Sequence, residues 1–229
     1  MKLQINKKNI LSLLLLNLLV FLIIYFRYDL KSANIFLPLI FEGDVVLFMN
    51  LLKNLAINFS EYFNGNLSYP FDSPQYHFPI FEHLPKIILI TLSLFSNDLI
   101  LNVNLMVLLS FFLNSSFMYI FLRAFSFNNF ICVVFGLYYA FLPYALIRIG
   151  GGHFTLIYYF IEPLFFLVLF RICFFENYRR TYSRYIFIIL ICIIFALSGL
   201  YYVFFKLAIL SFALFYYLIK NEKDIYRSL

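Results

Sequence analysis

The chain has 229 residues, of which 64% are hydrophobic and only 12% are charged. Soluble domains carry about 25% charged residues, so the composition excludes an ordinary soluble protein and indicates a polytopic membrane protein. Most basic residues behind the net charge of +6 lie in short segments between apolar runs, where they set orientation in the membrane, so nucleic-acid binding is not expected. The three cysteines form no CxxC pair, and neither a disulfide framework nor a metal knuckle is supported.

The first apolar run covers residues 10–26 and follows three lysines, Lys2, Lys7 and Lys8. It is longer than the ~7–15 apolar residues of a signal peptide, and no small-residue cleavage motif follows it. We therefore expect an uncleaved first transmembrane helix whose N-terminus is cytoplasmic.

Residues 27–98 are mixed in character and contain five of the seven prolines. Within this segment, the apolar residues of 45–63 recur at three- and four-residue steps, which predicts a helix lying in the membrane interface. Residues 86–95 are apolar but shorter than the ~20 residues that a span requires, so they predict a second interfacial helix. The whole of 27–98 is expected to be an extracytoplasmic loop.

Further apolar runs predict five more spans, at residues 99–122, 130–147, 154–174, 185–197 and 201–219. The predicted fold is an all-α polytopic membrane protein with about six transmembrane helices and two interfacial helices. It forms one transmembrane domain over residues 1–229, with a second outside loop at 148–153.

An alternative topology pairs residues 86–95 with residues 99–122 as a hairpin, which would invert the orientation of everything that follows. The inversion would place Arg123 and the arginine pair at 179–180 outside the cell. The positive-inside rule disfavours this arrangement, so we expect both termini to be cytoplasmic and the protein to lie in the plasma membrane.

Asp44 follows Gly43 at the start of the first predicted interfacial helix. A helix dipole favours a carboxylate there, so the residue is interpreted either as a helix cap or as a general base or metal ligand at the membrane surface. Farther along the loop, His77, Glu82 and His83 lie close together in the sequence. These types of residue suit a divalent cation, and the alternative is that they are solvated loop residues.

The segment from Arg148 to His153 contains three of the seven glycines in a row. Glycine permits unusual backbone dihedrals and close approach of a ligand, so free N–H groups beside Arg148 would suit a phosphate. The alternative is that the glycines only join two spans and that Arg148 reaches the lipid headgroups. In the favoured topology this segment lies outside, on the same face as Asp44.

Glu162 and Lys206 lie inside predicted spans, with Glu162 about two and a half turns into the helix expected after His153. A charge inside a bilayer is costly and is usually paired or functional. We expect the two side chains to pair and to hold two helices together.

Three motifs resemble the GT-C superfamily of membrane glycosyltransferases, and within it the bacterial branch of YfhO-like proteins. The motifs are Gly43-Asp44 after the first span, His77-Phe78-Pro79 in the outside loop, and Phe141-Leu142-Pro143-Tyr144 followed by Arg148 and Gly152-His153. The resemblance covers most of the chain at the level of layout. Members of this branch are usually longer, so the resemblance implies that the chain corresponds to an N-terminal portion and that a partner chain supplies further helices.

The resemblance implies a transferase that moves a sugar from a polyprenyl-phosphate donor, embedded among membrane lipids, to an extracytoplasmic acceptor. Asp44 would bind or deprotonate the acceptor hydroxyl. Arg148, with the backbone of Gly151 and Gly152 and the side chain of His153, would hold the phosphate leaving group.

The resemblance also implies that His153, with His77, assists the reaction or coordinates a divalent metal. Glu82 is expected as a further metal ligand from its place beside the histidines in the loop, and Tyr69 is expected to contact the substrate. Two other functions stay open: a non-catalytic membrane protein that handles lipid-linked sugars or polysaccharide, and a transporter. The two charges inside predicted spans suit a transporter. The sequence displays no inverted repeat and no pair of broken helices, which speaks against it.

Overall fold

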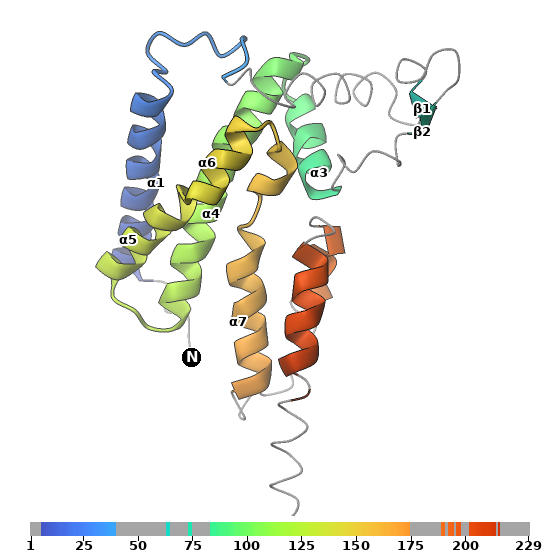
Figure 1. Cartoon of the computed structure of the whole chain (residues 1–229). Coiled ribbons are helices and arrows are strands. Elements are labelled where there is room, and N and C mark those ends of the chain that lie inside the picture. The colour runs from blue at the N-terminus through green and yellow to red at the C-terminus, as the bar shows by residue number, and fades with distance from the viewer. Residues whose placement is uncertain are drawn as a thin grey trace, which may run out of the picture. The chain divides into compact units, whose positions relative to one another are not determined.

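The computed structural model describes residues 6–39, 63–64, 73–74, 83–174, 189–190, 192–194, 196–197, 202–213 and 215. The chain divides into two compact units, Met1–Phe160 and Ile161–Leu229 (Figure 1). The described residues are mainly helical, as the composition predicted.

The first unit is built around three helices, α1 (Lys7–Arg27), α4 (Leu99–Ala124) and α5 (Asn129–Ala140). Two hydrogen bonds between α1 and α4 fix their antiparallel direction. The Tyr119 hydroxyl donates to the Asn9 carbonyl at 3.0 Å, and the Ser116 hydroxyl donates to the Asn17 side-chain carbonyl at 3.2 Å. The Asn129 amide donates to the Lys8 carbonyl at 3.4 Å, so α5 starts at the end of the bundle where α1 starts.

Most apolar side chains of α1 point away from the protein. Only Leu16, Val20 and Ile24 are buried, at four-residue steps that form one narrow stripe. The remaining face would be a large apolar surface in water, whereas lipid covers such a face at no cost. Among the described residues, three helical segments are long and apolar enough to cross a membrane: Lys7–Arg27, Leu99–Ala124 and Asn129–Gly150, the last of which contains two consecutive helices. A total of six spans stays a prediction.

Gly136 allows α1, α4 and α5 to approach closely at one point. A Cβ atom on this residue would lie 2.9 Å from Leu16 Cδ2 and 3.1 Å from the Ser115 carbonyl oxygen. Small residues at such crossings are typical of membrane helices, which associate through close packing rather than through the hydrophobic effect.

The span predicted at 130–147 is interrupted. Helix α5 ends at Ala140, and α6 (Pro143–Gly150) begins after a two-residue break. Because Pro143 has no N–H, the Tyr139 carbonyl loses its helical donor. The Tyr159 hydroxyl takes over that function, donating to the Tyr139 carbonyl at 2.7 Å and to the Ala140 carbonyl at 3.3 Å.

The prediction of one continuous helix over 154–174 is wrong. The structure has a 3₁₀ turn, η2 (Phe154–Ile157), then three non-helical residues, and then α7 (Ile161–Phe174). The break is stable because neighbouring side chains satisfy its carbonyls: Asn114 donates to Ile157 at 3.0 Å, and the Tyr139 hydroxyl donates to Tyr159 at 3.0 Å. Irregular backbone at membrane depth needs such partners.

A helix is present where residues 86–95 predicted one, as α3 (His83–Ser93). The short connection over 94–98 folds α3 back along α4, which resembles the hairpin alternative (Figure 1). The chain is nevertheless not inverted, because α4 begins at the end of the bundle where α1 finishes. An orientation of α3 in the membrane interface stays a prediction.

Two very short strands, β1 (Phe63–Asn64) and β2 (Ser73–Pro74), pair in antiparallel fashion. The interfacial helix predicted at 45–63 lies outside the described residues except for Phe63.

The second unit contains α7 and the helix Tyr202–Ala213. Phe165 and Leu169 of α7 form a small buried cluster with Phe166, Ile209 and Ala213. Of the span predicted at 185–197, residues 189–190, 192–194 and 196–197 are helical.

Candidate functional site

One end of the first unit gathers the segments that sequence reasoning singled out. The residues that follow α1, the start of α4 and the turn that ends α6 all lie there (Figure 1). Whether Asp44 lies close to the segment from Arg148 to His153 stays a prediction, because the described part of the first loop ends at residue 39. Asp44 itself lies outside the described residues, and so do Tyr69, His77 and Glu82. Which side of the membrane this end faces stays a prediction.

The Asn104 side chain on α4 holds the beginning of the first loop. Its amide donates to the carbonyls of Ile35 and Leu37, both at 2.8 Å, and its oxygen accepts from the Leu39 N–H at 3.1 Å. Asn104 is only 4% exposed. A buried amide with this many partners orders the segment that it binds. The first loop is therefore fixed against α4 as far as Leu39, which precedes Asp44 by five residues.

The segment after the glycine turn is tied to the same helix. Asn114 donates to the Ile157 carbonyl, and the Tyr158 hydroxyl donates to the Met106 carbonyl. The anchoring positions on α4, residues 104–114, extend over about 15 Å along its axis. Helix α4 is therefore the common support of both candidate site segments.

The expectation of free amides in the glycine turn is wrong. The N–H groups of Gly151, Gly152 and His153 donate to the carbonyls of Ile147, Ile149 and Arg148, at 2.9, 3.1 and 2.9 Å. With Gly152 at a φ of 78°, this is a Schellman motif that ends α6. A helix C-terminus also has a partial negative charge, which opposes an anion. The backbone of Gly151 and Gly152 is thus engaged in the cap, as the alternative interpretation of a joining turn anticipated.

The two ends of the glycine run should respond differently to alanine. Gly152→Ala forces a side chain into the left-handed region and should lower the free energy of unfolding by about 1–2 kcal/mol. Gly150→Ala is the matched control, since Gly150 is helical and a Cβ there meets no atom within 4 Å. Denaturant titration of the purified proteins in mild detergent measures the free energy of unfolding of both variants. Equal effects of the two substitutions would contradict the assignment of the cap to Gly152.

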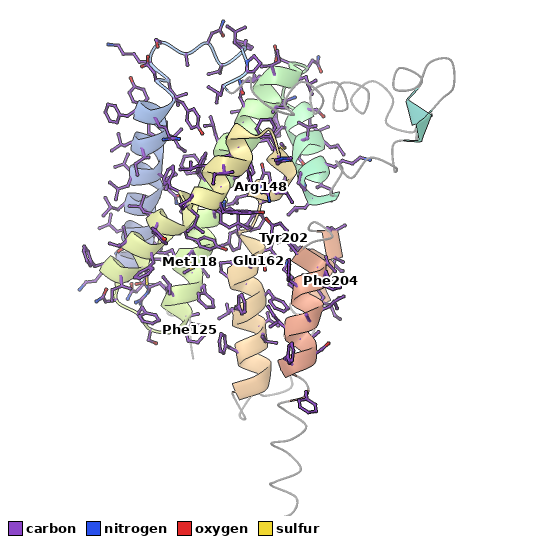
Figure 2. The ribbon with its side chains drawn as sticks, in the orientation of Figure 1. Met118, Phe125, Arg148, Glu162, Tyr202 and Phe204 are labelled. Carbon is purple, nitrogen blue, oxygen red and sulfur yellow. The ribbon has the colours of Figure 1, made fainter. Side chains whose placement is uncertain are left out.

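Arg148 lies in the last turn of α6, where the helix dipole favours a cation. Its guanidinium carbon is 5.3 Å from the centre of the Tyr144 ring, which identifies a cation–π contact. Figure 2 shows the position of Arg148. The Tyr144 ring in turn contacts Tyr159, with the ring centres 6.0 Å apart. Arg148 is half-buried, so its charge is available at this end of the bundle.

Tyr28, next to Arg27 at the end of α1, is a titratable group of this region whose pKa is shifted. Partial burial raises its pKa above 10.0, against the opposing effect of Arg27. The hydroxyl therefore stays protonated at neutral pH, and Tyr28 is no candidate for a general base.

The exposed imidazole of His153 packs against Gly151: a Cβ on Gly151 would lie 3.2 Å from His153 Cδ2. Within the described ranges, no three His, Cys, Asp or Glu side chains gather into a metal-binding group. The predicted metal ligands His77 and Glu82 are not among those residues. The metal site therefore stays a prediction.

The predicted pairing of Glu162 with Lys206 is confirmed in the second unit. Lys206 Nζ is 2.8 Å from Glu162 Oε1 and 5.6 Å from the centre of the Tyr202 ring (Figure 2). The position expected for Glu162 needs correction, because the helix starts at Ile161 and Glu162 occupies its first turn. The helix dipole favours a carboxylate at that place.

Sequence reasoning did not find four of the residues that build this region, namely Asn104, Asn114, Tyr139 and Tyr159. The chain contains 19 tyrosines, so no single tyrosine is conspicuous. The available signal for two of them, Tyr139 and Tyr159, was Pro143 within an apolar run, because the carbonyl that a proline leaves without its helical donor needs a nearby hydroxyl or amide.

Comparison with protein-family models, with curated proteins and with solved structures gives no match. The resemblance to the GT-C superfamily stays a prediction from sequence motifs.

Proposed function

We propose that the chain is a membrane glycosyltransferase, or the N-terminal portion of one, that transfers a sugar from a polyprenyl-phosphate donor to an acceptor outside the cytoplasm. Its fold would be GT-C-like, with the end of the first unit that carries Arg148 facing outward. The basic residues at the other end, Lys7, Lys8 and Arg123, agree with that orientation.

The observation that carries the proposal is the shared anchoring on α4. Asn104 holds residues 35–39, and Met106 and Asn114 hold residues 157–158. The loop that leads to Asp44 and the segment that follows the glycine turn are therefore both held by one helix, α4. Such an arrangement is what a carboxylate and a cation need in order to act on the same substrate.

In the proposed reaction, Asp44 accepts the proton of the acceptor hydroxyl, whose oxygen forms a bond to the anomeric carbon of the sugar. The bond from that carbon to the phosphate oxygen breaks, and the polyprenyl phosphate leaves with the electron pair. Arg148 stabilises the charge that develops on the phosphate. Because the glycine amides are engaged in the helix cap, this stabilisation falls to the guanidinium side chain.

Sugar transfer by variants tests the proposal. Asp44→Asn and Arg148→Ala should each lower the release of polyprenyl phosphate from a labelled polyprenyl-phosphate sugar by at least about a hundredfold, a typical loss for such groups. Their abundance in membranes should not change. Arg27→Ala is the matched control, an exposed arginine at the same end of the bundle with no assigned role. Transfer at the normal rate in both test variants would refute the mechanism.

A transporter is the second candidate, and the structure supplies an observation in its favour. The interruption at residues 141–142 and the non-helical residues 158–160 are the kind of broken helices that line transport sites. Loss of substrate uptake in Glu162→Gln with unchanged uptake in Asp44→Asn would favour this function. Binding of a polyprenyl-phosphate sugar without turnover would instead favour a non-catalytic protein that handles lipid-linked sugars.

A further inference from the structure

The Arg148 side chain is held by an aromatic ring rather than by an acid. Tyr144 is four residues earlier on α6, one turn away on the same face of the helix. The centre of its ring lies 5.3 Å from the guanidinium carbon, and Tyr144 is 38% exposed. In the part of the chain that the structure describes, no carboxylate pairs with Arg148. The N–H groups of the guanidinium are therefore not neutralised by an acid in these ranges.

Tyr144 is itself held in place by the break between α5 and α6. Its ring contacts Tyr159 edge to face, and Tyr159 contacts Tyr139 with ring centres 4.9 Å apart. Tyr139 and Tyr159 donate their hydroxyls to each other's carbonyls, at 3.0 and 2.7 Å. Three tyrosines thus connect the fixed backbone at the break to the guanidinium of Arg148.

We propose that Tyr144 is a positioning residue that orders the Arg148 side chain for the phosphate of a lipid phosphate; this inference rests on the proposed function. A free arginine loses side-chain entropy when it binds an anion. An arginine already stacked on a ring loses less, and its planar N–H groups stay directed outward. The order of the Arg148 side chain matters here because the glycine N–H groups donate to the carbonyls of the helix cap and do not bind the phosphate.

Binding of farnesyl phosphate to the purified protein in detergent tests the inference. Tyr144→Leu removes the ring and should weaken binding by about twofold to tenfold. Tyr144→Phe keeps the ring, and its affinity for farnesyl phosphate should be within about twofold of that of the wild type. If Tyr144 acted through its hydroxyl instead, Tyr144→Phe would weaken binding as Tyr144→Leu does. The matched control is Tyr138→Leu, because Tyr138 is 63% exposed on α5 and removing it should leave binding unchanged.

A second variant covers the case in which Tyr144→Leu does not fold. Arg148→Lys keeps the charge but loses the planar group that stacks, and it should also bind more weakly. Wild-type affinity in Tyr144→Leu or in Arg148→Lys would overturn the positioning role. Unchanged affinity in Arg148→Ala would instead overturn the proposed phosphate site itself. Displacement of farnesyl phosphate by an equal concentration of inorganic phosphate would overturn the assignment to a lipid.

Discussion

Glu162→Leu should destabilise the protein by about 3–5 kcal/mol, because it leaves the ammonium of Lys206 buried without its counterion. The Lys206 side chain is 5% exposed and the Glu162 side chain 23% exposed, so Lys206 is the more deeply buried partner. The Tyr202 ring at 5.6 Å gives some compensation, but a cation–π contact is worth only about 0.5–2 kcal/mol. The free energy of unfolding in mild detergent measures the effect.

The double variant Glu162→Leu with Lys206→Leu is the control for this prediction. Removing both charges avoids the uncompensated ion and often restores the stability of the original protein. We therefore expect the double variant to be more stable than the single variant by at least about 2 kcal/mol. A double variant as unstable as the single one would show that packing of Glu162, and not its charge, supports the second unit.

The second large effect is expected at Asn104. Asn104→Leu removes three hydrogen bonds and leaves the carbonyls of Ile35 and Leu37 and the N–H of Leu39 without their partner. At about 0.5–1.5 kcal/mol for each bond, the loss of stability should reach about 2–4 kcal/mol. The amide of Leu39 should also exchange its hydrogen faster, since its acceptor is gone. Hydrogen exchange measured by mass spectrometry reports this local loosening.

Asn102→Leu is the matched control on the same helix. Asn102 is 2% exposed, and in the described residues its side chain makes one hydrogen bond, from its amide to the Ser96 carbonyl at 2.8 Å. Asn102→Leu should lower the free energy of unfolding by less than Asn104→Leu does. It should leave the hydrogen exchange of the Leu39 amide unchanged. If the two variants were equally destabilised, with equal exchange at Leu39, the anchoring role of Asn104 would be wrong.

Long apolar helices were predictable because the bilayer imposes a strong and simple constraint on them. The runs at 10–26 and 99–122 appear as α1 and α4 with nearly the expected bounds. The pairing of Glu162 with Lys206 followed from the same physics, since two opposite charges in apolar runs need each other. In each of these cases the cost of placing a polar or charged group in an apolar environment determines the structure.

Breaks within apolar runs were not predicted. Hydropathy measures how apolar a segment is and does not report where its backbone stops being helical. Pro143 could have indicated the first break. The second, at residues 158–160, depends on Asn114 and Tyr139, whose donors come from other helices. The anchoring by Asn104 joins residues 65 to 69 positions apart, and no local pattern reports such a contact. The glycine run was misjudged because a helix cap and an anion site share the same composition.

The hydroxyl of Tyr159 has a consequence for how the chain enters the bilayer during synthesis. It reaches the carbonyls of Tyr139 and Ala140, about twenty residues earlier in the chain. When Asn129–Gly150 first emerges from the ribosome, Tyr159, whose hydroxyl donates to these carbonyls, has not yet been synthesised. The bend can close in lipid only after the next segment has been made, so insertion of the two segments should be a single concerted event.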